Sequence, residues 1–416
     1  MNERFKKIII VILFAAAVFT MAYLIYYYFF KPVQPDVLPL NNNQNQNFPG
    51  GQLPLINSGD VNRIGNTNVN GALPSISQLP EGVIISETAT GGYTRVNSIG
   101  SSKLISPQLN SSGGFNYFNS AEGRFYKIGA DGTATQLTAE RFYAVQKVTW
   151  SPGGASAVLE YPDGSNIVYD FAKNQQYSLP KELENFSFSS SGGELAASAI
   201  GQGEENNWIV TANPDGSNIQ FVERLGANAD KVDINWSPNG QMVAMYKKNV
   251  GTDAQEIIFI GRNEENFQSL TVNGGGFTGK WAPTGNRLLY SVYRHDNDLK
   301  PILQSVVAGG DNTGSNNIDL GLNTWPNKCA IANDGVTAYC GVPDYLPKGS
   351  GLYPVLANDS SDMFYKVNLA TGEKFLLAQP VGEASSYSAD KVFLSADEKT
   401  LYWQDAKSGR MYNIKL

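Results

Sequence analysis

One short stretch recurs along this chain and constrains its fold more than any other feature. Residues 234–240 read INWSPNG and are followed by the apolar run MVAMY at residues 242–246. Proline presets the backbone angle of a turn and Asn-Gly tolerates positive φ, so this stretch predicts two strands joined by a turn. Further copies, some of them degenerate, occur at residues 148–154, 186–192, 279–285, 329–335 and 392–397.

The spacing of these copies indicates the architecture. They follow one another at intervals of roughly forty to sixty residues, with several short apolar runs in between. Repeats of this length and composition are typical of β-propellers, in which each blade buries its faces against its neighbours. We therefore predict an all-β propeller domain over residues 81–416, built of seven four-stranded blades. Six or eight blades are also compatible, because the first unit at residues 103–138 is weakly marked.

The last repeat predicts only three strands, near residues 391–395, 401–403 and 411–416. Strand-forming residues also precede the first blade, among them YTRV at residues 93–96. We expect strands before residue 103, such as residues 93–96, to supply the missing strand of the seventh blade. Such a closure would tie the two ends of the domain together and cover an open sheet edge.

The Trp-Ser-Pro-x-Gly hairpin, set once per blade, resembles the TolB-like repeats of periplasmic propellers. These are related to WD-repeat units and to the propeller domain of dipeptidyl peptidase IV-type proteins. The resemblance covers roughly residues 100–416 and is best for the blade at residues 232–270. It implies a binding scaffold without identifying a ligand, because the motif residues shape turns and core rather than a site.

The N-terminal region predicts a membrane anchor. Residues 8–30 contain no charged side chain and, as a helix, would rise about 34 Å, enough for a hydrocarbon core of roughly 30 Å. Arg4, Lys6 and Lys7 precede the stretch, so residues 1–7 are expected in the cytoplasm and the propeller outside the cell membrane. The alternative is a cleaved signal peptide, but the run is long for one and no small-x-small cleavage site follows it.

Residues 31–80 are rich in Asn, Pro and Gly, and they predict a disordered linker. This linker would either hold the propeller away from the bilayer or serve only as a connection.

Composition limits the chemistry. The chain carries 38 acidic and 31 basic residues, a net charge of −7, which argues against nucleic-acid binding. One histidine and two cysteines are too few for a conventional zinc site. His295 lies in a polar stretch and is expected to be a solvated loop residue. The PDGSN sequences at residues 162–166 and 214–218 are expected to be plain turns rather than calcium loops.

We therefore expect no catalytic residue, no metal site and no cofactor, and interpret the chain as a scaffold for a protein or cell-envelope partner. The alternative is an extracytoplasmic enzyme or carbohydrate-binding propeller that uses the central channel or one loop face. Convergent carboxylates at the channel mouth would favour an enzyme, whereas an apolar aromatic patch on a loop face would favour a protein partner.

An insertion is the candidate partner site. Residues 342–362 connect the predicted second and third strands of blade six, and loops this long are usually functional or disordered. It contains five apolar side chains expected to contact a partner: Tyr345, Leu346, Leu352, Tyr353 and Val355. The same face is expected to carry the loops near residues 201–207, 247–255 and 294–298. The alternative is a disordered insertion with no partner. Deletion of residues 345–357 is expected to leave the melting temperature almost unchanged but to abolish partner capture.

Cys329 and Cys340 are the only cysteines in the sequence. They flank a predicted hairpin centred on Asp334-Gly335, and counting outward from a two-residue turn places them directly opposite each other. Directly opposed residues have Cβ atoms about 4.5 to 5.5 Å apart, close to what a disulfide needs. We predict this disulfide, although a two-residue turn would give the cysteines the wider, hydrogen-bonded spacing. The alternative is two buried thiols in the position that tryptophan occupies in other blades.

Overall fold

The computed structural model describes residues 19–21, 23, 82–129 and 131–416. The chain forms two units, residues 1–66 and 67–416. Residues 19–21 and 23 are helical. Within the described ranges, no helix combines the length and the apolar character that crossing a membrane requires. The span predicted at residues 8–30 lies mostly outside the described residues, and the linker predicted at residues 31–80 lies wholly outside them.

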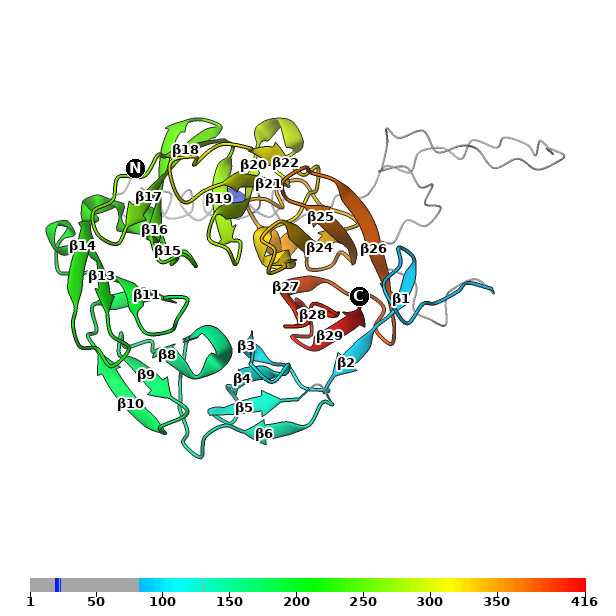
Figure 1. Cartoon of the computed structure of the whole chain (residues 1–416), viewed down its shortest axis with the longest axis horizontal. Helices are drawn as coiled ribbons and strands as arrows, with labels where there is room; N and C mark the ends of the chain where they lie inside the picture. Colours follow the sequence, from blue (N-terminus) through cyan, green and yellow to red (C-terminus); the bar gives the residue numbers. More distant parts are fainter. Residues whose placement is uncertain (1–18, 22, 24–81, 130) are drawn as a thin grey trace, which may run out of the picture. The chain divides into compact units, whose positions relative to one another are not determined.

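Residues 93–416 form seven sheets arranged in a ring (Figure 1). Each sheet is one blade, and the blades are numbered in chain order from β3. Blades one and two consist of β3 (Ile105–Leu109), β4 (Phe115–Asn119), β5 (Arg124–Ile128), β6 (Ala134–Gln136), β7 (Lys147–Trp150), β8 (Ser156–Glu160), β9 (Asn166–Asp170) and β10 (Gln175–Leu179). Blades three and four consist of β11 (Leu183–Phe188), β12 (Leu195–Ala199), β13 (Trp208–Ala212), β14 (Gln220–Arg224), β15 (Val232–Ile234), β16 (Met242–Gly251), β17 (Ala254–Gly261) and β18 (Leu270–Asn273).

The remaining three blades include the two strands that precede blade one. Blade five consists of β19 (Gly275–Trp281), β20 (Arg287–Tyr293), β21 (Pro301–Val307) and β22 (Ile318–Asp319). Blades six and seven consist of β23 (Cys329–Ile331), β24 (Thr337–Pro343), β25 (Asp362–Asn368), β26 (Lys374–Val381), β1 (Tyr93–Arg95), β27 (Ala389–Leu394), β28 (Thr400–Asp405), β29 (Met411–Lys415) and β2 (Asn97–Ile99). Short 3-10 helices connect some strands: η3 (Pro152–Gly154), η4 (Glu204–Asn206), η5 (Gly226–Lys231), η6 (His295–Asn297), η7 (Pro326–Lys328) and η8 (Pro354–Ala357).

Seven blades confirm the predicted all-β propeller and its blade number. The closure of the ring differs from the prediction in one respect. β1 does not complete blade seven but adds a fifth, parallel strand to β26 of blade six. β2 follows directly and pairs antiparallel with β29, which completes blade seven. β1 and β2 follow one another in the same direction along the outer edges of the two blades. The fourth strand of blade six, β26, runs parallel to that direction, whereas the third strand of blade seven, β29, runs antiparallel to it.

The recurring motif forms the turn between the first two strands of a blade. In blade four the Ser237 amide donates to the Met242 carbonyl at 2.8 Å, and the Gly240 amide donates to the Ser237 carbonyl at 2.9 Å. The Ser237 hydroxyl accepts a further bond from the Met242 amide at 2.9 Å. Gly240 has a φ of 78°, which favours glycine because a Cβ is disfavoured there. The motif therefore closes a loop of four residues, two more than a minimal hairpin.

The aromatic side chains of the repeats join adjacent blades. Phe125 of blade one packs against Trp150 and Phe171 of blade two, with ring centroids 5.3 and 5.0 Å apart. Phe364 of blade six lies 4.8 Å from Trp403 of blade seven. Aromatic pairs of this kind contribute about 0.5–1.5 kcal/mol beyond their buried area. The core of each blade is thus completed by its neighbour, and the ring positions the loops that form the candidate site.

Candidate functional site

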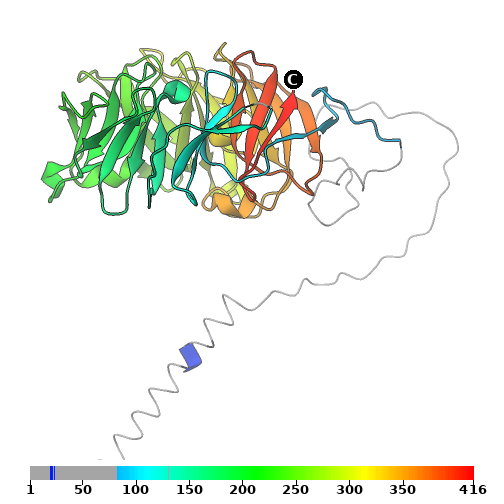
Figure 2. The ribbon, with the colours of Figure 1, turned by 90° about the horizontal axis from the view of Figure 1, so that it is seen from below.

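The predicted insertion connects β24 to β25 of blade six, across residues 344–361. It consists of turns and η8, and it projects from one face of the propeller (Figure 2). The same topological connection is made by residues 252–253 in blade four and by residues 406–410 in blade seven. The prediction that this segment is an insertion between the second and third strands is therefore confirmed.

The insertion is packed on the ring by a small apolar cluster. Leu346 and Ala357, near its two ends, form this cluster with Trp325, and all three side chains are buried. Leu346 is thus a structural residue rather than part of an exposed surface. Deleting residues 345–357 would remove both insertion members of the cluster, so the structure does not support the expected neutrality of that deletion.

Backbone hydrogen bonds fix the middle of the insertion to blade five. The Gly349 amide donates to the Asp298 carbonyl at 2.8 Å, and the Gly351 amide donates to the Leu299 carbonyl at 2.7 Å. On the other side, the Lys407 ammonium lies 2.6 Å from the Asp359 carboxylate, which links the insertion to blade seven. The insertion therefore bridges the loops of its two neighbouring blades.

A buried ion pair lies where the insertion ends. Asp362 is fully buried and Lys328 is 5% exposed, with the Lys328 ammonium 3.1 and 3.0 Å from the two Asp362 carboxylate oxygens. The Ala389 amide of blade seven donates to the same carboxylate at 2.5 Å. Burial raises the pKa of the Asp362 carboxyl, and the charge of Lys328 and the Ala389 amide oppose that rise.

Large apolar side chains of the insertion are exposed, beside exposed charged residues such as Lys348 and Asp359. Tyr345, Tyr353 and Val355 are 64, 65 and 68% exposed, and Leu352 and Leu356 are both 43% exposed. Four of these five side chains were predicted as partner-contacting residues. Leu346 was predicted and is buried, whereas Leu356 was missed and is exposed, because nothing in the sequence distinguishes the two leucines. We call Tyr345, Leu352, Tyr353, Val355 and Leu356 the insertion patch.

The histidine of the chain belongs to the same set of loops. His295 lies in η6 between β20 and β21, and its Nδ1 is 2.6 Å from the Asp253 carboxylate of the β16–β17 connection. Both side chains are substantially exposed. Over the described part of the chain, no group of three or more His, Cys, Asp or Glu side chains is placed to hold a metal ion.

The two PDGSN sequences form turns. Asp163 accepts hydrogen bonds from the Ser165 amide at 3.0 Å and its hydroxyl at 2.5 Å. Asp215 accepts the same pair from Ser217, at 2.9 and 2.6 Å. These bonds lower the pKa of both carboxyls. The carboxylates are used within the turns, as expected for plain Asp-Gly turns.

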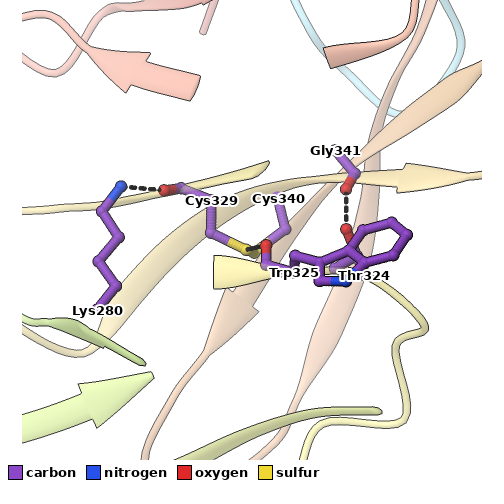
Figure 3. The surroundings of a disulfide bond; sticks show 6 residues. All are labelled: Lys280, Thr324, Trp325, Cys329, Cys340 and Gly341. Carbon is purple, nitrogen blue, oxygen red and sulfur yellow. Dashed lines mark hydrogen bonds between the residues drawn. A yellow bond between two sulfur atoms is a disulfide. The ribbon is translucent and has the colours of Figure 1, made fainter. Parts of the chain in front are cut away.

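The predicted disulfide joins Cys329 of β23 to Cys340 of β24 (Figure 3). The register places the two cysteines directly opposite each other, with Cα atoms 4.0 Å apart. The turn has four residues rather than the two expected, because the Ala332 amide donates to the Thr337 carbonyl at 2.8 Å. With a turn of four residues, Cys329 and Cys340 form a non-hydrogen-bonded pair. Residues of such a pair lie closer together than those of a hydrogen-bonded pair. No extra twist or bulge is then required.

A cavity of about 490 Å³ opens in the central channel beside the insertion. Its walls come from β19 of blade five, η7, β27 of blade seven, and Pro354 and Asn358 of the insertion. Lys280 and Lys391 both line it. The Lys280 ammonium donates to the Cys329 carbonyl at 2.6 Å (Figure 3). Burial, with a smaller contribution from the charge of Lys391, lowers the pKa of Lys280 to about 8.

Comparisons with known proteins extend the fold assignment. No protein-family model matches the sequence, and no curated protein is matched either. The β-propeller domain of Cps50 (Swd1) from Myceliophteria thermophila gives a TM-score of 0.51 at 12% identity, over 77% of this chain and 99% of that chain. An oligogalacturonate lyase in complex with manganese gives 0.51 at 13% identity, over 77% and 93%. A chain of the mitotic checkpoint complex gives 0.50 at 14% identity, over 84% and 99%.

The chain is a seven-bladed β-propeller. Identities this low establish the fold alone. The similar structures include a lyase as well as a chain from a multiprotein complex, so the fold does not decide whether this propeller is an enzyme. The function must be argued from the insertion and the channel.

The disulfide generates the first prediction. The disulfide leaves neither cysteine as a free thiol, so protein isolated from its native compartment, then denatured without reduction and alkylated, should carry no alkylated cysteine. Cys329→Ala combined with Cys340→Ala should lower the free energy of unfolding, because the disulfide no longer restricts the unfolded chain. The expected loss is modest, about 2–3 kcal/mol, because the loop that the disulfide closes is short. Mass spectrometry of denatured, unreduced, alkylated protein measures the number of alkylated cysteines. Urea denaturation measures the free energy of unfolding. Two alkylated cysteines in the unreduced sample would contradict the disulfide.

Proposed function

We propose that this chain is a membrane-anchored, extracytoplasmic propeller that acts as a scaffold and binds a protein partner through the insertion patch. The observation that carries the proposal is the exposure of five large apolar side chains within residues 345–356. Exposed apolar clusters on a soluble fold commonly mark protein-interaction sites. Two tyrosines lie among these five residues, and tyrosine is enriched in interface hot spots.

The base of the insertion supports the same proposal. A surface that is already ordered loses less conformational entropy when it binds than a flexible loop does. The cluster around Trp325 and the hydrogen bonds to Asp298 and Leu299 hold the patch in one arrangement. The patch thus has the preorganisation expected of a docking site.

Two features support the proposed location. The uncharged stretch at residues 8–30, preceded by Arg4, Lys6 and Lys7, favours an anchor with its N-terminus in the cytoplasm. The disulfide between Cys329 and Cys340 suits an oxidising compartment such as the outside of the cell membrane.

Site-specific crosslinking tests the partner surface. A photoreactive amino acid at Tyr353, which is 65% exposed, should capture a discrete protein in intact cells. The matched control is Phe221, which is 66% exposed on the outer strand of blade three and should not capture that protein. Val355→Asp, which places a charge within the patch, should reduce capture at Tyr353 by at least about tenfold, since it buries an unpaired charge on binding.

Surface substitutions are preferable to a deletion here, because they leave Leu346 and Ala357 in place. Equal capture at Tyr353 and Phe221, or capture at Tyr353 that Val355→Asp does not change, would contradict the proposed surface.

Protease accessibility tests the topology. Protease added to intact protoplasts should cut the chain between residues 31 and 80 and release the propeller, leaving a small membrane-protected N-terminal fragment. A cytoplasmic protein in the same sample should stay intact as the control. Cleavage that occurs only after the protoplasts are lysed would contradict the extracytoplasmic location.

A further inference from the structure

The channel cavity beside the insertion is lined by an excess of positive charge. Three lysines face it, Lys280, Lys328 and Lys391, and one carboxylate, Asp390. The charge of Lys328 is matched by the buried Asp362. One net positive charge therefore remains in the cavity.

The two other lysines have no acidic partner. Lys280 donates to a backbone carbonyl, that of Cys329, and forms no ion pair with the described residues. Lys391 is exposed and, across the described residues, forms neither a hydrogen bond nor an ion pair through its side chain. Lys391 is close enough to Lys280 for its charge to lower the pKa of Lys280. Two cations held near each other and offset only by the Asp390 carboxylate favour an anion between them.

Apolar side chains form much of the remaining cavity wall and favour an anion that also carries an apolar group. Trp325, Pro326, Val392 and Phe393 contribute to its walls. A monoanion matches the single net positive charge, whereas a dianion such as phosphate would leave one negative charge unmatched beside apolar walls. The volume of about 490 Å³ lies within the range of small-molecule pockets and is large enough to admit an amino-acid-sized acid.

The opposite side of the channel differs. A second cavity, of about 610 Å³ near blades three and four, is lined by Glu184, Asp230 and Asp233 with Lys147 as its lysine. Lys147 is already paired with Glu160. Carboxylates dominate this second cavity, so an anion is favoured in the cavity between blades five and seven over this one.

We propose that the cavity between blades five, six and seven binds the carboxylate of a small apolar acid, held between Lys280 and Lys391. The carboxylate could belong to a free acid or to the C-terminus of a peptide, since both offer the same monoanion beside an apolar group. This site is separate from the insertion patch, and binding to it is measured on the purified protein with no partner present. Failure of the crosslinking experiment would therefore leave this inference standing, and the reverse also holds.

N-acetyl-leucine is the probe, titrated into the purified full-length protein by calorimetry. It should bind, and N-acetyl-leucinamide, which lacks the charge, should bind at least about tenfold more weakly. Lys391→Met and Lys280→Met should each weaken binding by at least about tenfold. Lys391 is exposed, so its variant tests the site without disturbing the core. Lys399→Met is the matched control, because Lys399 is an exposed lysine of the same blade at the opposite end of β27, and binding should stay within about twofold.

The pH dependence distinguishes a binding role of Lys280 from a structural one. Only the protonated amine attracts the ionised carboxylate, so affinity should be constant between about pH 5 and 7, above the pKa of the ligand carboxyl, and should fall as the pH rises through about 8, the pKa of Lys280. Lys328, Lys391 and Asp390 face the same cavity. Lys280→Arg stays protonated throughout this range and should remove the fall. A peptide ending in leucine that binds more tightly than N-acetyl-leucine would assign the site to peptide termini, and weaker binding would assign it to free acids.

Equal binding of the acid and the amide would overturn the inference. So would affinity for the acid that Lys280→Met and Lys391→Met leave unchanged, or a complete absence of binding at millimolar concentrations of N-acetyl-leucine.

Discussion

The buried ion pair between Lys328 and Asp362 is the contact on which the functional face depends. Lys328 ends η7, Asp362 begins β25 immediately after the insertion, and the Ala389 amide at the start of β27 donates to the same carboxylate. Burying two charges is costly, so such a pair adds little net stability, yet removing one partner leaves an uncompensated charge and costs about 3–5 kcal/mol. Its effect is therefore positional: it fixes the base of the insertion against both blade six and blade seven.

Ring closure supplies the rigid frame around that contact. β2 completes blade seven and β1 extends blade six, so residues 93–99 hold together the two blades that the ion pair also joins. The channel cavity lies beside this contact, because Lys328 lines it and Pro354 and Asn358 of the insertion contribute to its wall. The most elaborated part of an otherwise regular propeller thus carries both proposed binding sites.

The sequence predicts the repeating part of this structure well, because the turn motif is local. A Ser whose hydroxyl accepts an amide bond and a Gly with positive φ specify the turn within five or six residues, as Ser237 and Gly240 do. The insertion and the pairing of Cys329 with Cys340 follow from register counting within one blade. Features that depend on contacts between blades could not be predicted. These include the edge that β1 joins, the burial of Leu346 against Trp325, and the approach of Lys280 to Lys391 from strands about a hundred residues apart.

Hydrogen exchange of the backbone amides in the insertion measures directly how much the order of the insertion depends on the ion pair between Lys328 and Asp362. Lys328→Met should accelerate amide exchange across residues 344–361 by at least about tenfold, since the unpaired Asp362 destabilises the base of the insertion, and should leave blades one to three unchanged. Adding Asp362→Asn to that variant should restore much of the protection, because it removes the unpaired charge and keeps an acceptor for the Ala389 amide. Lys366→Met, at an exposed lysine of blade six, should exchange like the unaltered protein. Unchanged protection of residues 344–361 in Lys328→Met, or equal loss of protection in every blade, would contradict the account.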